Sequence, residues 1–174
     1  MGFSVTIASA IVLIGMIVLF GSIGAVLVYS LNVLSDTARE YLRFERDKLD
    51  VKLELEIETI SQDSCTINVK NLGTKTIFLR DQRDFQWNTI MISYQNNVTH
   101  WPSYPIEDYT VLEVEITGTQ TSFDPTDHNF INPGEEARIS FDLPEGAPPI
   151  PHKATVIIVF ASHYGIIAQA EGRA

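Results

Sequence analysis

Residues 1–35 read MGFSVTIASAIVLIGMIVLFGSIGAVLVYSLNVLS and contain no charged side chain. A helix rises about 1.5 Å per residue and a bilayer core is about 30 Å thick, so roughly 20 apolar residues suffice to cross it. A secretory signal peptide would have basic residues before an apolar stretch of only about 7–15 residues, followed by its cleavage site. Here nothing basic precedes the apolar run, and the cleavage-like ASA at Ala8–Ala10 lies within it. We therefore predict an uncleaved N-terminal transmembrane helix over residues 1–35.

Residues 36–50, DTAREYLRFERDKLD, mix charges of both signs with good helix formers. A thin apolar stripe that includes Leu31, Leu34, Ala38 and Tyr41 continues the helical spacing. The sequence therefore predicts that the helix extends as a stalk over residues 36–50. The repeat covers too few heptads to predict a coiled coil.

From Val51 onward the apolar pattern changes to a period of two. VKLELEIETI alternates apolar and charged residues, as a strand does when one face is buried and the other is solvated. Further alternating stretches follow, separated by turn residues such as Pro133–Gly134, and about eight short strands are expected. This layout predicts an all-β, immunoglobulin-like antiparallel β-sandwich over residues 51–174, although the Cys–Trp–Cys core of antibody domains is absent.

The charge of the chain bears on its partners. The 174 residues carry a net charge of −10, and every charged side chain follows Ser35. Nucleic acid is therefore excluded as an expected partner, because binding phosphates requires a basic face, and a cationic or metal-rich surface is a more natural neighbour. The single cysteine, Cys65, excludes an intrachain disulfide, and its alternation with Ile67 and Val69 predicts a buried core thiol.

The sequence contains no constellation typical of catalysis. Its four histidines show neither HxxxH nor HExxH spacing, and no glycine-rich phosphate loop or serine nucleophile elbow is present. Asp124, Asp127 and His128 fall close together in SFDPTDHNF, where a turn stabilised by Asp side chains is a better interpretation than a divalent cation site. We expect no enzymatic activity, cofactor or metal centre.

Two features of the sequence disagree about which side of the membrane holds the β-domain. Basic residues follow the predicted helix and none precedes it, and the positive-inside rule then places the β-domain in the cytoplasm; these residues are Arg39, Arg43, Arg46, Lys48 and Lys52. The tripeptide NVT at Asn97–Thr99 is an acceptor for N-glycosylation, which with the all-β architecture favours an extracytoplasmic domain.

Aromatic residues in two polar segments are candidates for a partner-binding patch. Phe85 and Trp87 lie in RDQRDFQWNT, and Trp101 and Tyr104 lie in NVTHWPSYPIEDY, together with Tyr109. Aromatic rings in loops either plug the ends of a sandwich or form a binding surface, and the sequence leaves both open.

Small residues in the apolar helix are candidates for helix packing. Ser4 and Ala8 lie one turn apart, as do Gly21 and Ala25, and small residues allow membrane helices to approach closely. We expect a homodimer or a hetero-oligomer with a similar partner.

The start MGFSVTIASAIVLIGMIVLFGSI, the charged helix after it, and the segments INVKNLGTKTI, INPGEEARISF and ATVIIVFASHYGIIAQAEG resemble the archaellum accessory protein family FlaF, also called ArlF. The resemblance implies an archaeal protein with a single membrane helix and an immunoglobulin-like sandwich in the pseudoperiplasm. It also implies that the sandwich binds the surface-layer protein and anchors the archaellum motor as part of a stator, together with the partner FlaG. This relationship, and not the charge pattern, favours the outward orientation.

Other classes of membrane-anchored protein remain as alternatives. FlaG shares the same architecture, and a filament-forming archaellin or type IV pilin-like subunit also begins with a long apolar helix. Pilins carry a leader before a Gly cleavage site and often a Glu five residues into the mature helix, whereas here Met1 alone precedes Gly2 and Ile7 stands where that Glu would fall. We therefore expect an unprocessed N-terminus. A membrane-tethered enzyme is the least favoured alternative, because the catalytic constellations are missing.

Overall fold

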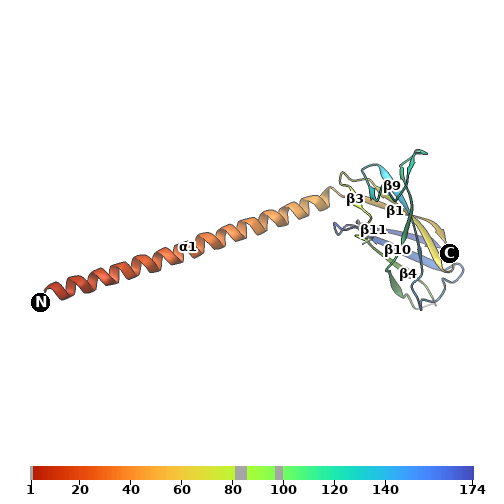
Figure 1. Cartoon of the computed structure of the whole chain (residues 1–174). Coiled ribbons are helices and arrows are strands. Elements are labelled where there is room, and N and C mark those ends of the chain that lie inside the picture. The colour runs from red at the N-terminus through yellow and green to blue at the C-terminus, as the bar shows by residue number, and fades with distance from the viewer. Residues whose placement is uncertain (1, 81–85, 97–99) are drawn as a thin grey trace. The chain divides into compact units, whose positions relative to one another are not determined.

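The chain folds into one long helix followed by antiparallel β-sheets, which confirms the predicted fold class (Figure 1). The computed structural model describes residues 2–80, 86–96 and 100–174, with the backbone alone for residues 2–6. Its contacts divide the chain into two compact units, residues 1–45 and 46–174. The elements are α1 (Gly2–Leu49), β1 (Leu53–Ile60), β2 (Ser64–Asn71), β3 (Ile77–Phe78), β4 (Thr89–Tyr94), β5 (Ser103–Ile106), β6 (Thr110–Ile116), β7 (Ser122–Phe123), β8 (Phe130–Ile131), β9 (Glu135–Asp142), β10 (Thr155–Ala161) and β11 (Ile167–Arg173).

Helix α1 runs without a break from the uncharged segment into the charged one. Its 48 residues give a length of about 72 Å. From Ile7 to Leu34 its large apolar side chains are exposed, and they occur on every side of the helix. The helix is long and apolar enough to cross a membrane, and its most apolar stretch has a mean hydropathy of 2.8. Arg46 and Lys48 in the last turn lie near the negative end of the helix dipole, where positive charge is favourable.

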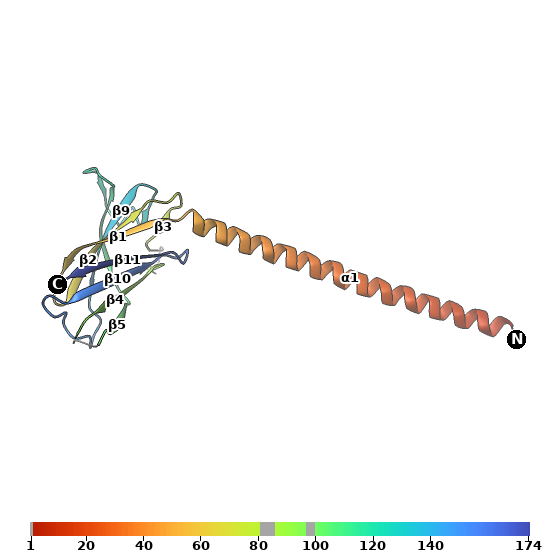
Figure 2. The ribbon, with the colours of Figure 1, turned by 180° about the vertical axis from the view of Figure 1, so that it is seen from behind.

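Two antiparallel sheets form the β-domain. One has five strands in the order β1-β2-β9-β6-β7, and the other has four in the order β11-β10-β4-β5 (Figure 2). The short strands β3 and β8 pair with each other in a separate two-stranded ladder. The alternating apolar residues found in the sequence explain the arrangement, because each main strand turns one side chain in two toward the opposite sheet.

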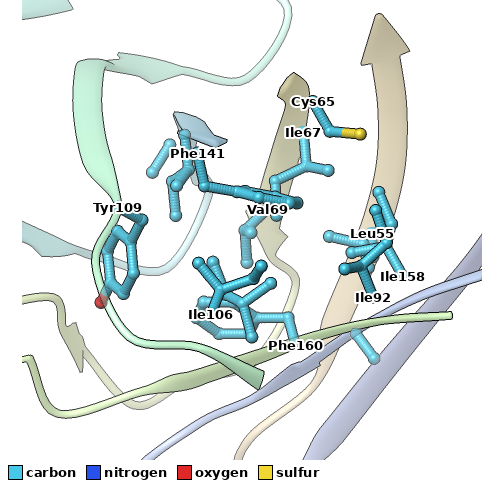
Figure 3. Close-up of a cluster of buried hydrophobic side chains, with 14 of the residues drawn as sticks. Leu55, Cys65, Ile67, Val69, Ile92, Ile106, Tyr109, Phe141, Ile158 and Phe160 are labelled. Carbon is cyan, nitrogen blue, oxygen red and sulfur yellow. The ribbon is translucent and has the colours of Figure 1, made fainter. Parts of the chain in front are cut away.

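The core lies between the two sheets and draws on both of them (Figure 3). Cys65, Ile67 and Val69 of β2 are fully buried, as are Ile158 and Phe160 of β10. Cys65 is therefore the core thiol that the sequence predicts, and burial raises its pKa to about 12 although a backbone hydrogen bond at Ser61 opposes the shift.

The turn after β2 packs tightly against the segment that leads into β1. A Cβ atom on Gly73 would lie 2.5 Å from the Asp50 carbonyl oxygen and 2.6 Å from the Lys52 nitrogen, so only glycine fits there. The turn is held by Asn71, whose Oδ1 accepts a hydrogen bond from the Gly73 nitrogen at 3.1 Å. The glycine in this turn therefore has a packing reason.

The structure adds three short strands, β5, β7 and β8, that sequence periodicity did not reveal. β5 contains Pro105 and follows Pro102, and both residues are typical of loops. Pro105 is tolerated because β5 is the edge strand of its sheet. A register shift between Ile57 and Thr59 also interrupts β1, which the regular alternation of the sequence did not predict.

Candidate interaction surfaces

The described residues contain no cluster suited to metal binding. Within residues 2–80, 86–96 and 100–174, no group of three or more His, Cys, Asp and Glu side chains is placed to hold a metal ion. Asp124 closes a turn instead: its Oδ1 accepts a hydrogen bond from the Thr126 nitrogen at 2.8 Å, and its carbonyl accepts one from the His128 nitrogen at 2.9 Å. The hydrogen bond from the Thr126 backbone lowers the pKa of Asp124. The turn predicted for this segment is therefore present.

A buried polar cluster joins His128 to the start of β9. Glu135 is only 8% exposed, and its Oε2 lies 2.9 Å from His128 Nε2 and accepts a hydrogen bond from the Asn132 nitrogen at 2.7 Å. The His128 ring packs between Phe123 and Phe130, with centroid distances of 4.5 and 4.0 Å. Sequence reasoning missed this cluster because His128 precedes β8 and Glu135 begins β9, and no sequence motif links residues at these two positions. Because Glu135 is buried and hydrogen-bonded to His128 and Asn132, the cluster stabilises the fold and is not an open binding site.

Aromatic rings gather near the Thr89 end of β4, and we call this set the aromatic cluster: Phe78, Trp87, Phe130, His163 and Tyr164. His163 is central, with its ring centroid 5.7 Å from Phe78, 6.2 Å from Trp87 and 4.1 Å from Tyr164. Burial lowers the pKa of His163, which favours a neutral ring in this setting. Trp87 itself is 47% exposed, so the cluster is partly a surface feature.

Trp101 lies at the other end of β4. The register pairs Thr89 with Ala161, just before the turn at Ser162–Gly165, and pairs Ser93 at the opposite end with Ser103, two residues after Trp101. Trp101 is 44% exposed. Trp87 and Trp101 are therefore separated by the length of β4 and do not belong to one continuous patch.

The remaining aromatic candidates differ in burial. Tyr104 is half-buried and stacks on the buried Tyr94 with a centroid distance of 5.7 Å. Tyr109 is almost fully buried, and its hydroxyl donates a hydrogen bond to the Leu79 carbonyl at 3.2 Å. These two rings fill the sandwich, whereas Trp101 faces solvent. Phe85 and Asn97 lie outside the described residues.

The outer face of the five-stranded sheet is strongly charged. Its strands align two rows of side chains, Glu54–Lys70–Glu136–Glu115 and Glu56–Asn68–Arg138–Glu113. Lys70 lies 2.8 Å from Glu56 and 3.9 Å from Glu136, and Arg138 lies 3.2 Å from Glu113. Carboxylates outnumber cations in both rows, so this face carries much of the negative charge of the chain.

Three of the small residues proposed for helix packing are exposed on the described part of α1. Ala8, Gly21 and Ala25 are exposed, and a Cβ atom on Gly21 would meet nothing within 4 Å. Ser4 is described by its backbone alone. This surface is available for contact with lipid or with another helix.

With this geometry in place, the chain can be compared with known proteins. It shares its fold with a chain of an archaeal flagellum. That structure, the archaeal flagellum of Methanospirillum hungatei strain JF1, aligns over 95% of this chain and 90% of its own with a TM-score of 0.59 and 15% sequence identity. The alignment thus extends over both the helix and the β-domain, and at this identity it concerns the fold.

Two further structures come from Sulfolobus acidocaldarius. One is the archaellum periplasmic stator protein FlaG, with a TM-score of 0.44, 13% identity, and coverage of 70% of this chain and 99% of that chain. The other is a chain of the archaellum periplasmic stator protein complex of FlaF and FlaG, with a TM-score of 0.43, 12% identity, and coverage of 71% and 88%. No protein-family model and no curated protein sequence matches the chain.

Proposed function

We propose that this chain is a non-enzymatic, membrane-anchored component of the archaellum whose β-sandwich lies outside the cytoplasm and acts as a stator that binds the surface-layer protein. The observation that carries the proposal is an uncharged helix, long enough to cross a membrane, followed by a β-sandwich, in a chain that aligns over 95% of its length with an archaeal flagellum chain. The sequence resemblance to the FlaF family supports the stator role over other extracellular roles. FlaG, or a similar accessory protein, is the proposed partner in the membrane, and the exposed Ala8, Gly21 and Ala25 are the proposed contacts.

The end of the sandwich that carries Trp101 is the proposed site of contact with the surface layer. A Cβ atom on Gly165 would lie 3.9 Å from Lys48 Cε, so the Thr89 end of β4 lies close to the last turn of α1. Trp101 lies at the opposite end, away from this attachment point. It is exposed, and Pro102 restricts the backbone next to it, so binding orders few additional residues. Large exposed aromatic side chains of this kind often dominate protein interfaces.

Binding of purified surface-layer protein to the full-length chain in detergent tests this assignment. Trp101→Ala should weaken binding at least about tenfold, as expected for a central interface residue, with an unchanged melting temperature. Trp87→Ala provides a matched control, because Trp87 is equally exposed at the other end of β4. Equal affinity for Trp101→Ala and the native chain would place the contact elsewhere, and no binding by the native chain would contradict the stator role.

Cysteine accessibility tests the proposed orientation. Thr119 is exposed in the turn after β6, whereas the native Cys65 is buried. Thr119→Cys should react with a membrane-impermeant thiol reagent on intact cells, and the native chain should not react. Protection of Thr119→Cys until the cells are lysed would place the β-domain in the cytoplasm, as the basic residues after the helix predict by the positive-inside rule.

A second function, that of a filament subunit, is favoured by one specific observation. The flagellum chain aligns over the helix as well as the β-domain. A helix that is apolar on every side suits the core of a filament as well as a membrane, because both bury it completely. The two functions differ in where the mature protein is found in the cell.

A further inference from the structure

The turn between β10 and β11, residues 162–166, contacts the last turn of α1, and we call it the β10–β11 turn. A Cβ atom on Gly165 would lie 3.9 Å from Lys48 Cε, and both residues belong to the compact unit of residues 46–174. Hydrogen bonds close the turn, because the Ser162 carbonyl accepts one from the Gly165 nitrogen at 2.8 Å and the Ile166 carbonyl accepts one from the Ser162 nitrogen at 2.9 Å. The β10–β11 turn is therefore part of the junction between the end of α1 and the sandwich.

His163 attaches the β10–β11 turn to the rest of the sandwich. Its backbone nitrogen donates a hydrogen bond to Asn88 Oδ1 at 3.1 Å, and Asn88 Nδ2 donates one to the Phe78 carbonyl at 2.8 Å. The His163 ring contacts the rings of Phe78, Trp87 and Tyr164 within the aromatic cluster. One residue thus joins the turn to β3 and to the segment before β4.

One nitrogen of the His163 ring is buried without a hydrogen-bond partner. Its Nδ1 atom is almost inaccessible to solvent and has no partner among the described residues. A neutral ring protonated at Nε2 tolerates this arrangement, because Nδ1 is then only an unpaired acceptor. A doubly protonated ring would place a positive charge and an unpaired N–H donor among aromatic side chains, which costs far more. The geometry therefore favours the neutral ring.

We propose that the β10–β11 turn is an acid-sensitive switch, in which protonation of His163 releases the turn from the last turn of α1. The added proton comes from solvent, and Nδ1 reaches water only if the turn moves away from Phe78 and Trp87. That movement carries Gly165 away from Lys48, so the junction loosens in acid and forms again on neutralisation. This inference does not depend on the proposed stator role.

Burial gives the switch its direction. Burial, and not a neighbouring charge, holds the pKa of His163 below its ordinary 6.5. Release of the turn therefore takes up a proton. The equilibrium constant for opening should be independent of pH above 6.5 and rise about tenfold for each pH unit below it, until the pH reaches the lowered pKa of the closed state.

Other titratable side chains lie on the elements packed against the β10–β11 turn. Among the described residues they are Arg46, Asp47 and Lys48 of α1, Lys75 and Arg80 on either side of β3, and Tyr164 of the turn itself. A hydrogen bond with Asp47 at 2.8 Å raises the pKa of Lys75, with a smaller contribution from Tyr164. Histidine is the side chain that ordinarily changes charge between about pH 5 and 8, so a transition of the junction in this range reports on His163.

Tryptophan fluorescence of the full-length chain in detergent measures the titration of His163. Trp101→Phe leaves Trp87 as the sole tryptophan, and its ring centroid lies 6.2 Å from that of His163. A protonated histidine quenches a neighbouring indole, so the emission should fall in acid with a midpoint below pH 6.5. His163→Phe keeps an aromatic ring that cannot be protonated and should abolish the transition. His152→Gln, at an exposed site, is the matched control and should leave it unchanged.

Hydrogen exchange measures the release of the turn. The Gly165 amide reports on the turn, and the Val51 amide, which donates to the Lys48 carbonyl at 3.2 Å, reports on the end of α1. Corrected for the intrinsic rate at each pH, the protection of both amides should fall about tenfold per pH unit below 6.5 in the native chain and stay constant in His163→Phe. The Leu143 amide, which donates to the Asp63 carbonyl at the other end of β2, is the internal control.

Three results would overturn the proposal. The first is the absence of a His163-dependent fluorescence transition between about pH 7 and pH 4, or a midpoint at or above pH 6.5. The second is an equal pH dependence of exchange in the native chain and in His163→Phe, with His163→Asn as a second non-titrating variant if His163→Phe lowers the melting temperature. The third is loss of protection at Gly165 but not at Val51, because the turn would then open without loosening the end of α1.

Discussion

Single buried polar residues hold the turns of the sandwich to its strands. Asn71 is fully buried, and its Nδ2 donates hydrogen bonds to the Lys75 carbonyl at 2.7 Å and to the Ile131 carbonyl at 2.9 Å. One side chain therefore links the end of β2 to the turn after it and to β8, which is distant in sequence. Glu135 does the same for the loop before β9 by accepting hydrogen bonds from both His128 and Asn132. Such contacts matter because a buried polar group without a partner is destabilising by about 1–3 kcal/mol.

Glu135 gives the sandwich a defined dependence on pH. Burial alone would raise the pKa of Glu135, but hydrogen bonds from His128 and Asn132 outweigh it and hold the pKa below the ordinary 4.5. A lowered pKa means that the ionised carboxylate stabilises the folded state above about pH 4.5, and this stabilisation is lost as the pH falls through the lowered pKa. We predict that Glu135→Gln lowers the unfolding free energy by about 2 kcal/mol at pH 7 and flattens its decline in acid.

Urea unfolding followed by tryptophan fluorescence from pH 7 to pH 3 measures both effects. Glu107→Gln changes an exposed carboxylate and serves as the control. Glu136 contributes in the opposite sense, because burial raises its pKa, so the comparison rests on the difference between variants at each pH. Parallel pH curves for the native chain and Glu135→Gln would contradict the assigned role.

At the scale of elements, β10 is the strand around which the four-stranded sheet is organised. It pairs with β11 on one side and β4 on the other, and alternate residues enter the core. Its two faces therefore make different contributions to stability. Ile158 is fully buried, whereas Ile157 lies on the outer face of the four-stranded sheet and is only half-buried.

A pair of alanine substitutions separates the two faces. Ile158→Ala should lower the unfolding free energy by about 3 kcal/mol, because it removes buried methyl groups and leaves a cavity. Ile157→Ala should lower it by less than about 1 kcal/mol in the dilute monomer, since the side chain is already partly solvated. Denaturant titration at low protein concentration measures both values. Equal losses at the two positions would mean that the register assigned to β10 is wrong.

The elements differ in how far the sequence predicted them. The alternation in Val51–Ile60 and the continuous apolar run in residues 155–161 identified β1 and β10, because the apolar pattern of a strand is local to its own residues. β5 was missed, since Pro102 and Pro105 favour a loop and edge pairing is determined by the neighbouring strand. The separation of Trp87 from Trp101 could not be predicted from sequence, because it depends on which strands pair with β4. The contact of His128 with Glu135 was also missed, because it depends on the path of the loop around β8.

At the scale of the whole molecule, charge is partitioned between surfaces. The apolar part of α1 has none, the five-stranded sheet presents rows of carboxylates with Lys70 and Arg138 among them, and the outer face of the four-stranded sheet has few charged side chains. The first surface suits lipid or packed helices, and the second remains solvated. Composition alone gave the net charge, and the pairing of strands determined how that charge is distributed.

The cellular location of the native protein tests the central proposal most directly, because an anchor stays in the membrane and a filament subunit leaves with the filament. Filaments sheared from cells of the native host can be separated from the membranes, and the chain quantified in each fraction. A membrane-anchored stator predicts that the chain stays with the membranes and is released by detergent but not by shear or high salt. Recovery of most of the chain in the sheared filaments would contradict the stator account and identify the protein as a filament subunit.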